Sequence, residues 1–198
     1  MASMSLLITD QTPASFWITH PDNIFKDNHA AGSDRYGYWF DTKPNPMGPS
    51  FTEDICPENA QLGEFSNNVA HSNGRYGLRI FHKLIPRQNP CSSLIYDPTN
   101  TTDPYWRNPL ITANFYNLTS WKNNRNGAIA EQVGDVRFIN FKVADNLLAG
   151  IEFSLTKDVV DGYAQIIDAL VIGHSANAEE KLMSASLHGI ITPRTENF

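Results

Sequence analysis

The sequence has little charge, and the charge that it has is weighted towards acid. Charged residues make up 18% of the 198 residues, and the formal net charge is −6. This balance argues against nucleic acid or an anionic membrane as a partner of the whole surface, although it leaves room for a local basic patch. No run of about 18 apolar residues occurs, so we expect no membrane contact by this segment. Residues 1–7 lack the pattern of a signal peptide, so any secretion signal is expected outside this chain.

Cysteine and the common catalytic motifs are also scarce. The two cysteines, Cys56 and Cys91, are too few to indicate a redox compartment by count. Six histidines without regular spacing, and no cysteine cluster, give no support for a transition-metal site. The sequence contains no Gly-rich phosphate loop and no Gly-x-Ser-x-Gly motif. We therefore predict no metal and no cofactor, and neither nucleotide chemistry nor serine hydrolysis has support.

Turn-forming residues, in contrast, are abundant, and they follow a template that occurs four times. Asn occurs 19 times, and Gly and Pro 12 times each. Each copy begins with a phenylalanine, followed by Asp or Asn after two residues, Ser or Asn after eight, and Gly after twelve. The phenylalanines are Phe25, Phe65, Phe115 and Phe138. The polar residues are Asp27, Asn67, Asn117 and Asn140 at the first position, and Ser33, Asn73, Asn123 and Asn146 at the second. The glycines are Gly37, Gly77, Gly127 and Gly150, and a degenerate fifth copy begins at Ile166.

The template predicts a β-solenoid. After each glycine, apolar residues alternate with mixed ones, which is the period of a strand with one buried face. One copy follows the next after only 23 residues between Phe115 and Phe138, which is too short for helical repeats. We predict an all-β, right-handed parallel β-helix, with asparagine ladders in its turns and glycines that adopt a positive φ. A β-sandwich with coincidental repeats is the alternative.

The other spacings indicate two long insertions. Phe25 to Phe65 is 40 residues and Phe65 to Phe115 is 50, so two coils hold extra residues at about 41–61 and 86–109. We expect 1–198 to be a single, partial β-helix domain. Because both insertions leave adjacent coils at the same point, they should lie side by side. Each carries one cysteine, so Cys56 and Cys91 are predicted to form a disulfide.

Several stretches resemble a known family. They include Phe16-Trp17-Ile18-Thr19-His20-Pro21-Asp22-Asn23, Gly37-Tyr38-Trp39-Phe40, Ile55-Cys56-Pro57 and the closing Gly189-Ile190-Ile191-Thr192-Pro193-Arg194. The chain resembles the β-helix region that follows the G8 domain in the fibrocystin and fibrocystin-L family, and more distantly in the cell-surface and secreted hyaluronidases. The resemblance implies a large receptor-like protein with one membrane span, whose ectodomain lies on the outer side of the cell membrane. We expect this chain to be a non-catalytic extracellular structural and binding module of such a protein. Only the hyaluronidase branch is linked to catalysis, and no catalytic motif of that branch is found here. A glycan-cleaving β-helix enzyme is the alternative function.

Three arginines are the first candidate ligand site. Arg35, Arg75 and Arg125 each stand two residues before a template glycine, so they should stack on consecutive coils. Guanidinium groups match carboxylate and sulfate geometry, and Tyr36 and Tyr76 beside them could pack on sugar faces. An anionic glycan is the predicted ligand, and another extracellular protein is the alternative partner. The alternative is that the arginines are purely structural and that Asp34, Glu131 and turn carbonyls neutralise them.

Two histidines and two sequons complete the candidates. His29 and His71, with Asp34, could act as acid and base in the cleavage of a sugar chain, although histidines beside turns are commonly structural. Asn100 begins a sequon in the second insertion and is predicted to be glycosylated. Asn117 also begins a sequon, but it occupies a ladder position, so we expect it to be bare.

Overall fold

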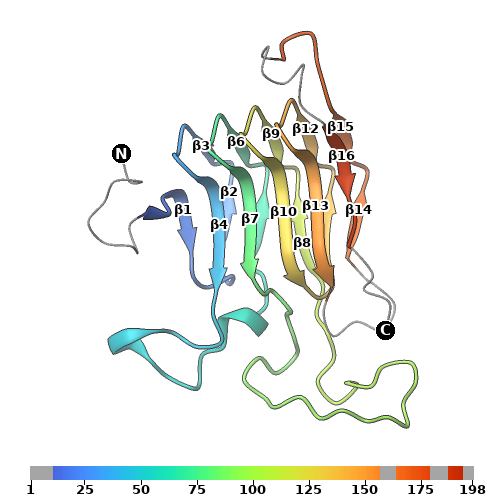
Figure 1. The fold of residues 1–198 in the computed structure, drawn as a ribbon. Coiled ribbons are helices and arrows are strands. Elements are labelled where there is room, and N and C mark those ends of the chain that lie inside the picture. The colour runs from blue at the N-terminus through green and yellow to red at the C-terminus, as the bar shows by residue number, and fades with distance from the viewer. Residues whose placement is uncertain (1–10, 157–163, 179–186, 194–198) are drawn as a thin grey trace.

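The computed structural model describes residues 11–156, 164–178 and 187–193. In this part of the chain the strands form three parallel sheets, which stack coil on coil (Figure 1). The predicted all-β parallel β-helix is thereby confirmed. Sheet A contains, in spatial order, β1 (Ala14–Ile18), β4 (Tyr36–Thr42), β7 (Tyr76–His82), β10 (Asn126–Val133), β13 (Ala149–Thr156) and β16 (His188–Ile191).

The other two sheets have five short strands each. Sheet B contains β14 (Gln165–Ile167), β11 (Val136–Ile139), β8 (Ala113–Tyr116), β5 (Glu64–Ser66) and β2 (Ile24–Lys26). Sheet C contains β15 (Leu170–Ile172), β12 (Lys142–Ala144), β9 (Thr119–Trp121), β6 (Val69–His71) and β3 (His29–Ala31). Each coil therefore contributes one strand to each sheet, in the order B, C, A along the chain.

The phenylalanines of the template form a ladder through the core. Phe65 pairs with Phe25 on one side and with Phe115 on the other, and Phe115 pairs with Phe138. Phe65, Phe115 and Phe138 are fully buried, and their burial contributes roughly 2 to 3 kcal/mol each. Small residues such as Ala70 on sheet C face them, which leaves room for the rings.

Positive φ angles occur at the polar position two residues after each template phenylalanine, and also at Ser72, Lys122, Asp145, Gly32 and Gly48, but not at the template glycines. Asp27, Asn67, Asn117, Asn140 and Asp168 have φ between 53° and 57°. Asn and Asp tolerate this left-handed conformation better than other residues with a side chain.

The expectation of a positive φ at the template glycines is wrong. Gly77 and its equivalents lie within or beside the strands of sheet A, where a Cβ atom would collide with the next coil. At Gly77 the colliding groups would be the Ser120 hydroxyl and the carbonyl oxygen of Gly127. The glycines are therefore required for close packing between coils.

The predicted asparagine ladders form in two places. In the interior, Asn73 Nδ2 donates to Asn123 Oδ1 and Asn123 Nδ2 donates to Asn146 Oδ1, each at 2.9 Å. On the surface, Asn117 Nδ2 donates to Asn67 Oδ1 at 2.8 Å, and Asn117 Oδ1 accepts from Asn140 Nδ2 at 2.7 Å. Amides can extend such a ladder indefinitely, because each offers both a donor and an acceptor.

Both insertions leave sheet A at the carboxyl ends of neighbouring strands, at the lower edge in Figure 1. The first follows β4, which continues to Thr42, so the chain leaves the sheet slightly later than predicted. It contains two short 3-10 helices, η3 (Gly48–Ser50) and η4 (Pro57–Asn59). The second follows β7, and within it Arg87 is only 2% exposed and donates from Nη1 to the carbonyl oxygen of Asn108 at 2.8 Å.

Candidate anionic-ligand site

The three predicted arginines stack at the turn that connects sheet C to sheet A. The backbone N–H of Arg75 donates to the carbonyl of Arg35 at 2.7 Å, and β7 pairs with β10 in the register that places Arg125 beside Arg75. Leu148 follows on the next coil, where its N–H donates to the carbonyl of Arg125. Arg35 and Arg75 are half-buried and Arg125 is exposed. We call Arg35, Arg75 and Arg125 the arginine ladder.

No carboxylate of the described residues forms an ion pair with the arginine ladder. Glu131, which the structural reading assigned to the ladder, instead binds Arg79, with Oε1 at 2.8 Å from Nε and 2.7 Å from Nη2. Arg125 donates from Nη1 to the Tyr76 hydroxyl at 3.3 Å, which is a neutral partner. Cations on successive coils without carboxylates repel one another, so an anion bound there would be stabilised.

Tyr36 and Tyr76 are buried and do not lie exposed beside the arginine ladder. Their exposed fractions are 1% and 7%, and the two rings stack on each other at 5.7 Å with an interplanar angle of 4°. The Arg79 guanidinium covers them, lying 5.0 Å from the centre of the Tyr36 ring and 5.5 Å from that of Tyr76. Neither ring presents an accessible face for a sugar in this conformation.

The two predicted histidines come together on the outer surface of sheet C. The rings of His29 and His71 are 4.9 Å apart, and Trp121 from the next coil stacks on His71 at 4.4 Å. Burial lowers the pKa of His71, and the nearby charge of His29 lowers it further. His71 Nδ1 also lies 3.0 Å from the Ser72 hydroxyl. The structure records no hydrogen bond or ion pair between Asp34 and either histidine.

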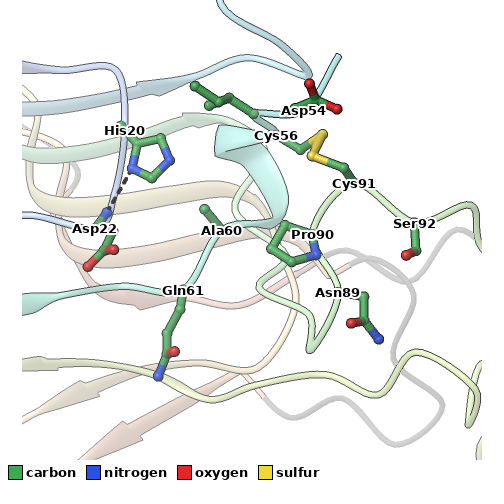
Figure 2. A pocket seen from close by; sticks show the side chains of 11 residues that line it. His20, Asp22, Asp54, Cys56, Ala60, Gln61, Asn89, Pro90, Cys91 and Ser92 are labelled. Carbon is green, nitrogen blue, oxygen red and sulfur yellow. Dashed lines mark hydrogen bonds between the residues drawn. A yellow bond between two sulfur atoms is a disulfide. The ribbon is translucent and has the colours of Figure 1, made fainter. Parts of the chain in front are cut away.

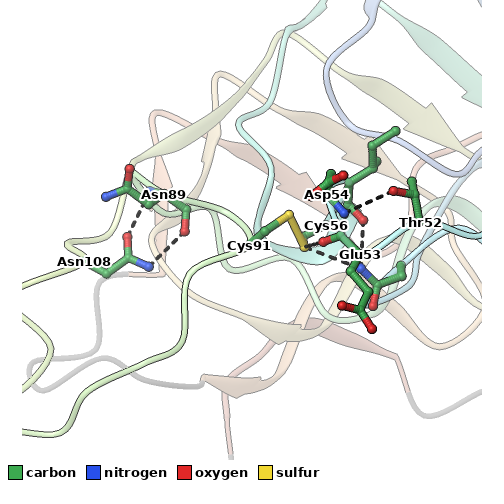
Figure 3. Close-up of a disulfide and its surroundings, with 9 residues drawn as sticks. Thr52, Glu53, Asp54, Cys56, Asn89, Cys91 and Asn108 are labelled. Atoms are coloured by element: carbon green, nitrogen blue, oxygen red, sulfur yellow. Dashed lines mark hydrogen bonds between the residues drawn. A yellow bond between two sulfur atoms is a disulfide. The ribbon is translucent and has the colours of Figure 1, made fainter.

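The predicted disulfide between Cys56 and Cys91 is confirmed, and it joins the two insertions (Figure 3). The Cα atoms are 5.3 Å apart. On one side, Asn45 Nδ2 donates to the carbonyl of Ile55 at 3.0 Å. On the other, Asn89 and Asn108 exchange two hydrogen bonds of 2.9 and 3.0 Å. The disulfide thus adds a covalent link to insertions that also meet through the backbone, since the N–H of Arg87 donates to the carbonyl of Asn59 at 3.0 Å.

A cavity of about 570 Å³ lies beside the disulfide (Figure 2). His20 and Asp22 line it from the turn between β1 and β2, and both insertions supply the remaining walls. His20 Nδ1 accepts the backbone N–H of Asp22 at 3.3 Å. The lining includes two carboxylates, of Asp22 and Asp54, and neither lysine nor arginine. Its charge is therefore opposite to what an anionic glycan requires, which separates this cavity from the arginine ladder.

The described residues hold neither a metal-binding cluster nor a membrane-spanning helix. Within residues 11–156, 164–178 and 187–193, no three His, Cys, Asp or Glu side chains come together as a metal site. No helix in the described residues is long and apolar enough to cross a bilayer.

The chain is similar to a family model and to several much longer proteins. Residues 3–78 match the family model described as the CEMIP beta-helix. Over 99% of the chain, the sequence is 34% identical to fibrocystin-L of Homo sapiens. It is 33% identical over 89% of the chain to the cell migration-inducing and hyaluronan-binding protein of Mus musculus, and 33% identical over 83% to cell surface hyaluronidase CEMIP2 of Homo sapiens.

Residues 3–78 therefore hold a CEMIP beta-helix domain, and the chain as a whole is similar to fibrocystin-L. The resemblance seen in the sequence is confirmed. The chain covers 4% of the length of fibrocystin-L, 14% of the hyaluronan-binding relative and 13% of CEMIP2. The family assignment therefore concerns one β-helical stretch of much longer proteins.

Two residues of the candidate surface were missed from the sequence. Arg79 follows its template glycine at a position that holds Trp39, Ile129 and Glu152 in other copies, so nothing marked it as a partner for Glu131. Trp121 could have been found, because it lies six residues after its template phenylalanine, as His71 does. The signal was the shared template position.

The two sequons differ in the freedom of their amides. Asn100 Oδ1 accepts the backbone N–H groups of Thr102 and Asp103 at 3.1 Å, and its Nδ2 forms no hydrogen bond with the described residues. Asn117 uses both its amide atoms in the surface ladder. Nδ2, the atom that would carry an N-linked glycan, is therefore available in Asn100 and hydrogen-bonded in Asn117. Glycosylation of Asn100 stays a prediction.

Proposed function

We propose that this β-helix is an extracellular structural and binding module, and that its arginine ladder binds an anionic glycan. The observation that carries the proposal is the stack of Arg35, Arg75 and Arg125 without carboxylate partners on three successive coils. Relatives named for hyaluronan binding and for cell-surface hyaluronidase activity support both the ligand class and the location. The finer placement, in the ectodomain of a single-span receptor-like protein, rests on similarity to fibrocystin-L.

The physical basis is recognition by charge. An arginine whose guanidinium is not neutralised by the protein can form a charge-assisted hydrogen bond with a carboxylate or sulfate, which contributes about 1.5 to 3 kcal/mol. Three such groups in a row suit a linear polyanion better than a single small anion. The net charge of −6 makes this basic strip a local exception and confines a polyanion to it.

The test compares two triple variants by calorimetric titration with anionic glycan oligosaccharides. Replacing Arg35, Arg75 and Arg125 by Gln should weaken binding at least tenfold. The charge-matched control replaces Arg107, Arg137 and Lys142 by Gln, which lie away from the ladder, and should bind almost as well as the unmodified chain. Equal affinities for the two triple variants would refute the ladder as the site. Thermal melts of both variants establish that they are folded.

Cleavage of a glycan is the second candidate function. His29 and His71 favour it, because they lie on strands β3 and β6, which lead into the turns of Arg35 and Arg75. The lowered pKa of His71 favours its neutral form, which can act as a base. Incubation with size-defined hyaluronan followed by sizing of the products tests this. Shortened products that disappear in the His29→Gln, His71→Gln double variant would establish cleavage, and unchanged hyaluronan would exclude it for this chain.

A further inference from the structure

We propose that the arginine ladder selects glycans that carry a negative charge on every sugar residue, as sulfated glycosaminoglycans do, over hyaluronan. The inference rests on the proposed function, because it names the substrate class of the same site. It follows from the spacing of the arginines along the axis and from what surrounds them.

The arginine ladder has one cation for each coil. Arg35, Arg75 and Arg125 occupy equivalent positions on strands that pair directly, and neighbouring strands lie about 4.8 Å apart. The ladder has three rungs. Pro13 holds the equivalent position on the coil before Arg35, and Leu148 holds it on the coil after Arg125. A glycan that follows the ladder runs across the strands, along the axis of the β-helix.

An extended glycosaminoglycan advances by close to one strand spacing for each sugar. Three successive sugars therefore lie over three successive arginines. Hyaluronan has a carboxylate on alternate sugars only, so one chain can meet Arg35 and Arg125 with carboxylates and must place a neutral N-acetylated sugar at Arg75. A chain with sulfate on the sugars between the carboxylates supplies an anion to all three rungs. The unmatched Arg75 would lose solvent without gaining a partner, which costs affinity.

The surroundings offer a neutral sugar little compensation. The rings of Tyr36 and Tyr76, the aromatic groups nearest the ladder in sequence, are stacked on each other and covered. Arg79 is already held by Glu131 and by the Tyr36 hydroxyl, at 2.7 Å from Nη1. Recognition at the arginine ladder therefore depends on whether each arginine meets a negatively charged group of the glycan.

Chondroitin gives matched probes for the experiment, because its hexasaccharide can be compared with and without sulfate on the hexosamine. Binding of the chain to chondroitin sulfate, unsulfated chondroitin and hyaluronan hexasaccharides is measured at one fixed ionic strength. We expect the sulfated hexasaccharide to bind about tenfold more tightly than the other two, which corresponds to about 1.4 kcal/mol. The salt dependence of log Kd should be steeper for it by about one unit.

The central rung provides the decisive variant. Arg75→Gln should lower affinity for the sulfated hexasaccharide to that of the unsulfated one and should leave hyaluronan binding almost unchanged. Arg107→Gln, an exposed arginine of the second insertion, is the control and should change neither. Matching thermal melts establish that both variants fold.

The possible results distinguish selectivity for a charge on every sugar from the binding of anionic glycans in general. Equal binding of hyaluronan and the sulfated hexasaccharide, with Arg75→Gln weakening both, would overturn the charge-per-sugar inference and leave the anionic-glycan function standing. Absence of binding to all three glycans would overturn the proposed function itself. Tighter binding of the sulfated glycan that Arg75→Gln leaves intact would place sulfate recognition outside the ladder and overturn the inference.

Discussion

The β-helix body and its two insertions satisfy their buried polar groups in different ways. In the body, the interior asparagines Asn73, Asn123 and Asn146 find partners at the same position of the next coil. In the insertions the contacts are singular, such as the disulfide and the buried Arg87 bonded to Asn108. Stability in the body therefore accumulates coil by coil, whereas each insertion depends on a few individual contacts.

Removal of the disulfide is the strongest test of this difference between the β-helix body and its insertions. Replacing Cys56 and Cys91 by Ser opens a loop with a sequence separation of 35, which should lower the free energy of unfolding by about 4 kcal/mol in the chain-entropy model. Neither cysteine lies in a strand, so the sheets should persist while the insertions become sensitive to protease. Urea unfolding and limited proteolysis measure the two effects. Uncut insertions and an unchanged midpoint would show that other contacts suffice.

The interior ladder should respond nearly as strongly to a single change. Asn123 is 1% exposed and bonds to Asn73, Ser120 and Asn146. Asn123→Ala leaves these buried partners unpaired and should cost roughly 2 to 3 kcal/mol. The control is Asn177→Ala on the exposed surface, which should change stability by less than about 0.5 kcal/mol. Equal denaturation midpoints for the two variants would mean that the ladder adds nothing to stability.

The two sequons allow a milder comparison of body and insertion. Asn117→Ala breaks the surface ladder and should cost roughly 1 to 3 kcal/mol, whereas Asn100→Ala should cost little because only a turn of the insertion is affected. In secreted material, glycopeptide mass spectrometry should find sugar on Asn100 and a bare Asn117. Sugar on Asn117 alone would contradict the role of that amide in the ladder.

The same contrast explains what could be predicted from the sequence. The register of the body was accessible because Phe25, Phe65, Phe115 and Phe138 repeat at fixed offsets from Asn and Gly, and the structure pairs those phenylalanines directly. The conformational role of glycine was misassigned. A one-letter pattern shows that a residue lacks a side chain, but it does not show whether the cause is backbone angle or the proximity of the next coil.

The candidate site was only partly accessible for a related reason. Stacking of Arg35, Arg75 and Arg125 follows from the template, whereas their lack of carboxylate partners depends on where Glu131 points. Glu131 binds Arg79 because β7, which carries Arg79, pairs directly with β10, which carries Glu131, and the Arg79 guanidinium is held among the rings of Tyr36 and Phe81. Such choices between neighbouring partners are made by side-chain packing, which a repeat pattern does not encode. The burial of Tyr76 was hidden for the same reason.

The smallest expected effect lies in the second insertion, at Asp97. Hydrogen bonds from the Thr99 hydroxyl, at 2.6 Å, and then from Trp106 Nε1, at 3.0 Å, lower the pKa of Asp97 from 3.8 to about 2. A pKa lowered by folding stabilises the insertion at pH values above the ordinary one, and that stabilisation is lost as the pH falls from about 4 towards 2. The carboxylate is exposed, so the change should be local and sensitive to salt.

Tryptophan fluorescence of the chain and of a Trp106→Phe variant isolates the signal of Trp106. We expect that signal to change with a midpoint near pH 2, while the far-ultraviolet circular dichroism of the sheets is retained through the same step. Asp97→Asn removes the titrating group and should abolish the step. A midpoint near pH 4, or a step that persists in Asp97→Asn, would show that Asp97 does not hold Trp106. A simultaneous loss of the sheet signal would show that the insertion and the body unfold as one unit.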